Sequence, residues 1–204
     1  MIFGVVPAGG KSKRMGRPKL SLPFRNRTVL ECVLNALRLG GCDATVVVLG
    51  TQAAGLEPLA RQAGAHICML PEDTADMRAT VEIGLCWLRR EFGPNDKDAW
   101  LLAPADFPAL ESSVVAALRC AYLANPGYSI IIPSCGGLRG HPVLLSWRHA
   151  EGLQEYTPGQ GLNTYLRLHS DQTLELAVEK PSILADLDTQ QDYERLLKLS
   201  PPWH

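Results

Sequence analysis

The sequence predicts an α/β fold with a mostly parallel, twisted sheet, and three observations support this prediction. Short apolar segments alternate with amphipathic helical segments along the chain. The apolar segments lack period-two alternation, which is typical of strands in a sheet covered by helices on both faces. No internal repeat or linker rich in glycine, proline or serine divides the 204 residues, so we expect one domain over residues 1–204.

The N-terminal elements have the clearest signals. An apolar, β-branched run at 2–6 predicts the first strand, and a loop rich in glycine and cations follows at 7–18. Thr28 opens a helical pattern that ends at Gly40-Gly41, and residues 44–49 predict a buried strand. The remaining expected elements are a helix at 56–62, a strand at 66–70, a helix at 80–90, a strand at 100–103, a helix at 112–123 capped by Ser112 or Ser113, strands at 129–132 and 143–146, a helix at 162–168, a strand at 174–178 and a helix at 190–199.

Composition excludes several classes of protein. The chain is 46% hydrophobic and 20% charged, which excludes a disordered or low-complexity protein. Its apolar runs are far shorter than the roughly 20 residues of a membrane-spanning helix. No basic stretch precedes an apolar one at the N-terminus, so we expect no signal peptide, no membrane partner and a cytoplasmic location.

The six cysteines do not form a recognisable framework. None forms a Cys-x-x-Cys pair, and no histidine stands at zinc-site spacing from a cysteine. We therefore expect reduced thiols, with neither disulfides nor a zinc site.

Positive charge is concentrated near the N-terminus. Residues 1–30 hold seven lysines and arginines and no acid, whereas the other 174 residues hold 13 basic and 21 acidic residues, a net charge of −8. This asymmetry favours a local anion site, with a solvated basic loop as the alternative. Phe24 is the only aromatic residue among 11–27, so we expect no nucleic-acid partner.

The cationic loop follows the first strand, where ligands bind in parallel sheets. Gly9 and Gly10 would let backbone amides approach a phosphate closely, and Arg14 and Lys19 would add charge-assisted hydrogen bonds. The Walker A pattern would need glycine in place of Val5. The dinucleotide fingerprint would need glycines where Lys11 and Arg14 stand, so both patterns are excluded.

Four segments together resemble one family. Residues 8–19 read Ala-Gly-Gly-x-Ser-x-Arg-Met-Gly-x-x-Lys, which resembles the nucleotide-binding signature of the MobA/MocA-like nucleotidyltransferases. These enzymes attach GMP or CMP to molybdopterin and belong to the glycosyltransferase-A-like NTP transferases. Residues 102–108, 139–143 and 186–193 resemble the family's Asp-x-Pro, Gly-His-Pro-Val and C-terminal Asp-x-Asp-Thr segments. The resemblance covers nearly the whole chain and implies a Rossmann-like fold of the nucleotide-diphospho-sugar transferase type.

The resemblance also implies roles for individual residues. The phosphate loop would hold the β- and γ-phosphates, a lysine would neutralise the α-phosphate, and carboxylates would hold Mg²⁺. The implied catalytic residues are Arg14, Lys19 and Asp106; the nucleotide-binding residues are Ala8, Gly9, Gly10, Lys11, Ser12, Arg14, Lys19 and Thr80; the acceptor-binding residues are Arg139, Gly140 and His141; and the metal ligands are Asp106 and Asp188, with Asp186 as the alternate.

Local structure alone offers a simpler interpretation of some of these residues. Asp106 could cap the turn before Pro108, and His141 could be an extended residue before Pro142. Residues 188–192 also form an N-cap pattern for the last helix, which we expect in addition to any metal binding.

The base and the acceptor are less well defined. Residues 8–10 resemble the guanylyl branch of the family, whereas 139–143 and 77–85 resemble the cytidylyl branch. Asp76 stands where that branch has glycine, and Thr80 where it has serine. A cation that the family often carries after the His-Pro segment is absent from Gly161-Leu162-Asn163.

The resemblance implies Mg²⁺-dependent transfer of a nucleoside monophosphate from an NTP to a phosphorylated small molecule, with release of pyrophosphate. CTP:molybdopterin cytidylyl transfer is the expected reaction, with handover to a molybdoenzyme or its chaperone. The alternatives are a GTP-using enzyme, another acceptor, and a non-catalytic nucleotide- or cofactor-binding protein.

Overall fold

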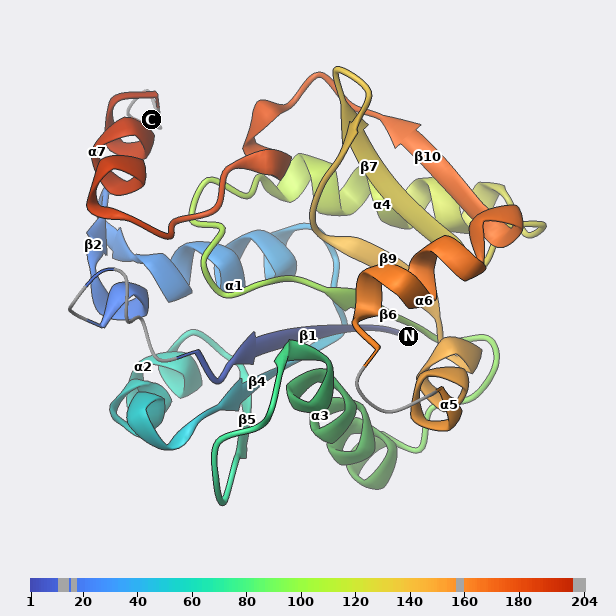
Figure 1. Ribbon diagram of the computed structural model, residues 1–204, viewed down its shortest axis with the longest axis horizontal. Coiled ribbons are helices and arrows are strands. Elements are labelled where there is room, and N and C mark those ends of the chain that lie inside the picture. Colours follow the sequence, from blue (N-terminus) through green and yellow to red (C-terminus); the bar gives the residue numbers. More distant parts are fainter. Residues whose placement is uncertain (11–14, 16–17, 157–159, 200–204) are drawn as a thin grey trace.

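The computed structural model describes residues 1–10, 15, 18–156 and 160–199, and a mostly parallel sheet forms its centre (Figure 1). The strand order is β10-β7-β9-β6-β1-β4-β5, with β8 paired to β7. Only β9 and β8 run antiparallel to their neighbours in this sheet among the described residues. The strands are β1 (Ile2–Ala8), β4 (Ala44–Leu49), β5 (His66–Met69), β6 (Ala99–Leu102), β7 (Ile130–Cys135), β8 (Leu138–Arg139), β9 (Val143–Ser146) and β10 (Thr173–Ala177).

Helices cover both faces of the sheet, as the apolar strands predict. Val5 and Val6 are both fully buried, yet they belong to two different core clusters because successive side chains point to opposite faces. The cluster of Val6 includes residues of α1 (Val29–Leu39), α2 (Glu57–Gln62) and α4 (Ser112–Ala124), and that of Val5 includes residues of α3 (Met77–Phe92), α5 (Arg148–Glu155) and α6 (Leu162–Leu168). The predicted α/β class is therefore confirmed.

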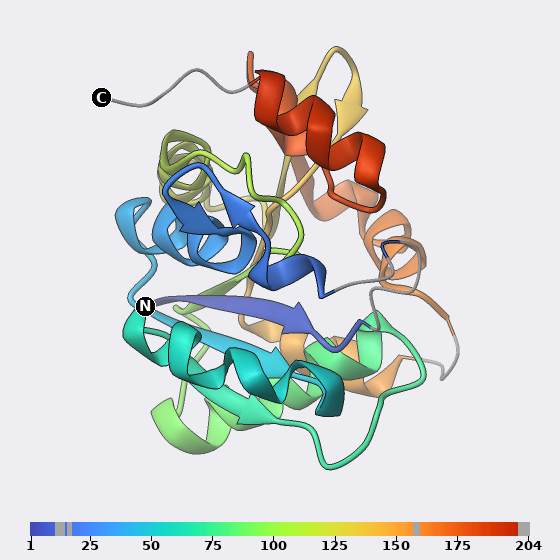
Figure 2. The ribbon, with the colours of Figure 1, turned by 90° about the vertical axis from the view of Figure 1, so that its left-hand side faces the viewer.

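A small hairpin and the last helix lie beside α1. The hairpin pairs β2 (Pro23–Phe24) with β3 (Arg27–Thr28), and α7 (Gln190–Leu199) lies next to it (Figures 1 and 2). The Tyr193 hydroxyl donates a hydrogen bond to the Pro23 carbonyl. Phe24 and Leu196 are both buried in the core on this face of the sheet.

Local signals explain where the principal helices begin and end. Thr28 and Glu31 form a reciprocal capping box at the start of α1, and Gly40 caps its end. The predicted helix at 80–90 is longer, because Asp76 caps α3 and Gly93 ends it with a left-handed φ of 57°.

Three local features differ from the predictions. The N-cap of α4 is Glu111, so the prediction of a Ser112 or Ser113 cap was wrong: both serines lie inside the first turn. Helix α5 is absent from the predicted elements; it starts within two residues of β9 and has a largely polar sequence. The β2–β3 hairpin, whose strands are two residues long, is also absent from them.

The sheet brings two sequence segments to one edge. β1 pairs in parallel with β6, and Val5 stands opposite Leu102. The loop after Ala8 and the turn containing Asp106 therefore emerge side by side. In the part of the chain that the structure describes, no helix is both long enough and apolar enough to cross a membrane.

A buried histidine joins the helices on the α3 face. His149 in α5 is only 3% exposed, and its Nε2 and Nδ1 lie 2.8 Å from the hydroxyls of Ser129 and Tyr165. Burial, reinforced by His169 and Arg148, lowers the pKa of His149 to about 4 from its ordinary 6.5. The neutral imidazole therefore connects the start of β7 with α5 and α6.

We expect His149 to make folding stability depend on pH. Because the unfolded chain binds the proton more tightly, the contribution of His149 is present above about pH 6.5 and is lost as the pH falls towards 4. We expect the free energy of unfolding, measured with denaturant, to fall between pH 7 and pH 4.5. The fall should be about 2 to 3 kcal/mol larger for the native protein than for His149→Gln. Equal losses in the two proteins would contradict this assignment.

Candidate active site

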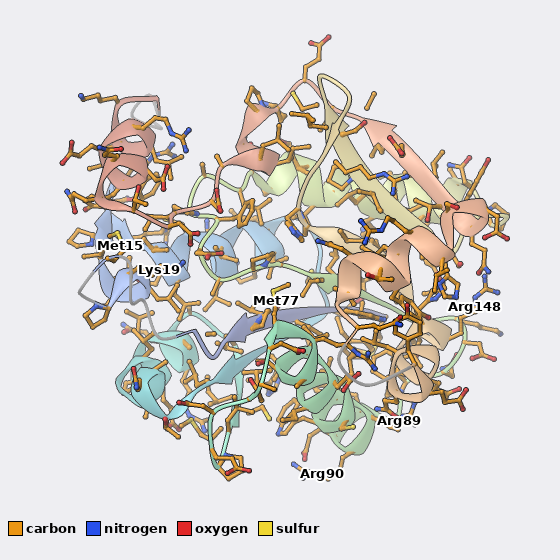
Figure 3. All side chains as sticks on the ribbon, in the orientation of Figure 1. Met15, Lys19, Met77, Arg89, Arg90 and Arg148 are labelled. Atoms are coloured by element: carbon orange, nitrogen blue, oxygen red, sulfur yellow. The ribbon has the colours of Figure 1, made fainter. Side chains whose placement is uncertain are left out.

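A cleft of about 350 Å³ opens where β1 and β6 end. In Figure 3, Met77 lies at the start of α3 and Lys19 lies in the segment between β1 and β2, and both residues border the cleft. The other lining residues are Pro7, Ala8, Gly9, Gly10, Leu20, Asp73, Thr74, Ala75, Asp76, Thr80, Pro104, Ala105 and Asp106.

Small residues allow the chain after β1 to approach its neighbours closely. A Cβ added to Gly50 would lie 2.9 Å from the Cα of Gly9, and one added to Gly9 would lie 3.3 Å from Oγ1 of Thr80. A Cβ on Gly10 would meet no atom of the described residues within 4 Å, so among these residues the Gly10 backbone borders open space. This arrangement fits a loop whose backbone amides face a bulky ligand.

The described residues at the two ends of the phosphate signature line the cleft. Ala8, Gly9 and Gly10 line the cleft at the N-terminal end, and Lys19 lines it at the C-terminal end. Lys11, Ser12 and Arg14, which the sequence analysis placed on the phosphates, lie outside the described residues.

Lys19 joins the two predicted metal ligands. Its Nζ lies 2.7 Å from Oδ2 of Asp106 and 2.9 Å from Oδ1 of Asp188, and it donates a 2.9 Å hydrogen bond to the Leu187 carbonyl. The Lys19 side chain is 14% exposed, against 24% for Asp106 and 36% for Asp188. Three segments distant in sequence thus meet at one ammonium group.

The charges of this cluster shift pKa values in opposite directions. Burial alone would lower the pKa of Lys19, but the charges of Asp106 and Asp188 and their hydrogen bonds raise it above its ordinary value. Burial and the nearby charges of Asp188 and Asp106 raise the pKa of Asp186. The ammonium therefore stays charged, and Asp186 experiences an excess of negative charge.

The donor set fits a divalent cation that also binds phosphate. Asp106 and Asp188 already share one cation, the Lys19 ammonium. Among the described residues, no three His, Cys, Asp or Glu side chains group closely enough to hold a metal ion. Two carboxylates, with substrate phosphates and water completing the shell, are a common Mg²⁺ arrangement. Asp188, and not Asp186, shares Lys19 with Asp106.

Residues at the start of α3 form the opposite wall of the cleft. The Thr80 hydroxyl lies 2.5 Å from that of Thr74 and donates a 3.2 Å hydrogen bond to the Asp76 carbonyl. The Asp76 carboxylate accepts a 2.9 Å hydrogen bond from the Ala79 amide. The acid that departs from the family pattern at position 76 is thus the N-cap of α3, a role that its place before a helix could have predicted.

The predicted acceptor residues contact different parts of the structure. His141 contacts Phe107, which follows Asp106, with ring centroids 5.3 Å apart. Burial lowers the pKa of His141, although Asp106 and a hydrogen bond to the Leu102 backbone oppose the shift. Arg139 instead pairs with Glu175 of β10, at 2.7 Å from Nε to Oε1.

Two contributors to the site had no signal in the sequence. The Leu187 carbonyl accepts a hydrogen bond from Lys19, and the Leu187 amide donates a 2.9 Å hydrogen bond to the Asp106 carbonyl. Both groups belong to the backbone, which every residue type supplies, so no residue pattern could have identified them.

Comparisons with known proteins identify the family of the chain. The model of the MobA-like NTP transferase domain matches residues 4–174. Nicotine blue oxidoreductase of Paenarthrobacter nicotinovorans is 27% identical over 202 residues, covering 96% of each chain. Molybdenum cofactor cytidylyltransferase of Escherichia coli K12 is 26% identical over 191 residues, covering 93% of this chain and 92% of that protein.

A solved relative has the same fold over its whole length. Rv0371c of Mycobacterium tuberculosis H37Rv superposes with a TM-score of 0.82 at 27% identity, over 97% of this chain and 98% of that one. Its complex with manganese superposes with a TM-score of 0.75 at 26% identity, covering 98% and 99% of the two chains. With the family model matching most of the sequence, the chain belongs to the MobA-like NTP transferase domain family and is a nucleotidyltransferase.

Proposed function

We propose that the chain, as a single domain, transfers CMP from CTP to molybdopterin in an Mg²⁺-dependent reaction that releases pyrophosphate. The observation that carries this proposal is the Asp106–Lys19–Asp188 cluster, whose Lys19 and Asp106 line the cleft together with Gly9 and Gly10. The cluster supplies two carboxylates for a cation and one ammonium for a phosphate.

The difficulty of nucleotidyl transfer is electrostatic, because an anionic acceptor must approach an α-phosphate surrounded by negative oxygens. Catalysis therefore consists mainly of positioning and charge neutralisation. Asp106 and Asp188 would hold Mg²⁺, which supplies positive charge at the triphosphate when bound. The backbone of Gly9 and Gly10, with Lys11, Ser12 and Arg14, would bind the β- and γ-phosphates.

Lys19 is the side chain that we propose exchanges partners during the reaction. In the structure its ammonium binds the two carboxylates at 2.7 and 2.9 Å. In the nucleotide complex it would instead neutralise the α-phosphate, where negative charge develops in the transition state. Its raised pKa keeps the ammonium charged for this role.

The choice of CTP and molybdopterin rests on sequence likeness. The Escherichia coli cytidylyltransferase matches nearly the full chain, and residues 77–85 and 139–143 resemble its branch. Thr80 borders the cleft, and we propose that it contacts the base. Arg139 lies outside that lining and pairs with Glu175, and we propose its guanidinium as a contact for an acceptor phosphate. Handover of the product to a molybdoenzyme or its chaperone is part of this proposal.

We expect pyrophosphate release with CTP, Mg²⁺ and molybdopterin, and much slower release with ATP, GTP or UTP. A preference for GTP would favour the guanylyl alternative that residues 8–10 suggest. Binding of NTPs without turnover, with every acceptor tried, would favour a non-catalytic protein. Oxidation or reduction of a substrate without pyrophosphate release would favour chemistry like that of the oxidoreductase relative.

Substitutions in the cluster should affect activity and metal binding in different ways. Asp106→Asn should weaken Mn²⁺ binding because it removes one anionic ligand. Lys19→Gln should tighten Mn²⁺ binding without nucleotide, because it removes the cation that occupies the carboxylates. Both variants should lower kcat by about 100-fold or more.

Manganese titrations followed by electron paramagnetic resonance, together with steady-state kinetics, check these expectations. Lys97→Gln, at an exposed lysine outside the cleft, is the matched control and should change neither property. Weaker Mn²⁺ binding in Lys19→Gln, or near-native kcat in either cluster variant, would contradict the assignment.

A further inference from the structure

Asp188, the second of the two carboxylates, belongs to a segment that forms neither a strand nor an α-helix. Residues 180–188, here called the strap, leave β10 and pass through one short 3₁₀ helix (Pro181–Leu184) before α7 begins. The strap runs from the edge of the sheet to the hairpin side of the molecule (Figure 1). Its fold must therefore be fixed by contacts with other elements if Asp188 is to stay within reach of Asp106.

The loop between β8 and β9 holds the middle of the strap. The His141 amide donates a 2.9 Å hydrogen bond to the Ile183 carbonyl, and the Gly140 amide donates a 2.8 Å bond to the Pro133 carbonyl of β7. Ile183 is fully buried. One dipeptide thus ties the strap to a central strand of the sheet.

Glycine is required at position 140 by this close approach. A Cβ added there would lie 2.7 Å from Cγ1 of Ile183 and closer still to its carbonyl oxygen. Real Cβ atoms do not approach backbone atoms this closely, so any larger residue must push the strap away. Gly140 therefore allows the close packing of the strap, and it does not itself line the cleft.

The loop between β8 and β9 also contacts the turn that carries Asp106. The His141 ring packs edge-on against Phe107, the residue after Asp106. The Leu187 amide then closes the connection with its hydrogen bond to the Asp106 carbonyl. The dipeptide Gly140-His141 consequently touches both segments that carry the acids.

A second anchor fixes the beginning of the strap. The Lys180 ammonium lies 2.7 Å from Oε2 of Glu111, and the Ser182 hydroxyl donates a 3.2 Å hydrogen bond to Oε1 of the same carboxylate. Glu111 stands at the N-cap position of α4, five residues after Asp106, and its side chain makes no capping hydrogen bond there. The strap is thus held to the Asp106 loop at both ends.

We propose that Gly140 and His141 are positioning residues that fix the spacing of the Asp106 and Asp188 carboxylates, with Glu111 as a second anchor. This inference rests on the proposed metal-binding role of the two carboxylates. It assigns Gly140 and His141 a different task from the acceptor contact that the family resemblance implies, because their described contacts are with the strap, with Phe107 and with the strands of the sheet. Loss of a group that hydrogen-bonds a metal ligand typically costs about 10- to 100-fold in metal affinity, and we expect the lower end of this range for contacts that act through the strap.

The test compares Gly140→Ala with Gly127→Ala in the full chain. Both variants add one methyl group, but a Cβ at Gly127 would meet no atom within 4 Å in the part of the chain that the structure describes. We expect Gly140→Ala to bind Mn²⁺ about 10-fold more weakly than the native protein, with Gly127→Ala unchanged. Unchanged Mn²⁺ affinity in a folded Gly140→Ala, with only the acceptor KM raised, would overturn the inference in favour of an acceptor contact.

Two further variants keep the test decisive. If Gly140→Ala fails to fold, the double variant Glu111→Gln/Ser182→Ala, which releases the other end of the strap, should also weaken Mn²⁺ binding; native affinity there would overturn the inference. Asp188→Asn separates this inference from the proposed function. If Asp188→Asn binds Mn²⁺ as tightly as the native protein, the assignment of Asp188 as a metal ligand fails. If Asp188→Asn weakens Mn²⁺ binding but the Gly140 and Glu111/Ser182 variants do not, only the positioning role fails.

Discussion

The structure of the site depends on one interaction, the Lys19 ammonium held between the Asp106 and Asp188 carboxylates. The three residues come from the loop after β1, the turn after β6 and the strap before α7. Without the cation, the carboxylates would repel one another, and Asp186 beside them would increase that repulsion. The ammonium therefore stabilises an acidic cluster that is suited to a divalent ion once nucleotide is present.

Each level of the fold contributes to this meeting point. The parallel pairing of β1 with β6 places the first two segments together, as is typical of ligand sites in parallel sheets. The strap has no such pairing and relies on Glu111, Gly140, His141 and the Asp106 carbonyl. The sheet thus places the start of the loop after β1 beside the turn that carries Asp106, and a set of loop contacts positions Asp188.

Much of this arrangement could be predicted from the sequence, because apolar runs and helix caps are local signals. The strand at 44–49 and the helix that begins after Thr28 have the predicted positions. The contacts that carry the site are less local: the Leu187 carbonyl is a backbone group, and Arg139 pairs with Glu175 only because β7 lies beside β10. The family resemblance predicted that Asp106, Lys19 and Asp188 belong to one site. The ion pairs of Lys19 with both carboxylates could be found only in the structure.

The most direct test of the account is a crystal structure with Mn²⁺ and a non-hydrolysable CTP analogue. The anomalous signal of manganese locates the ion independently of the protein atoms. The account predicts Mn²⁺ bound to the carboxylates of Asp106 and Asp188, with the Lys19 ammonium on the α-phosphate. Manganese bound elsewhere, or a Lys19 that still bridges the two carboxylates beside bound nucleotide, would contradict it.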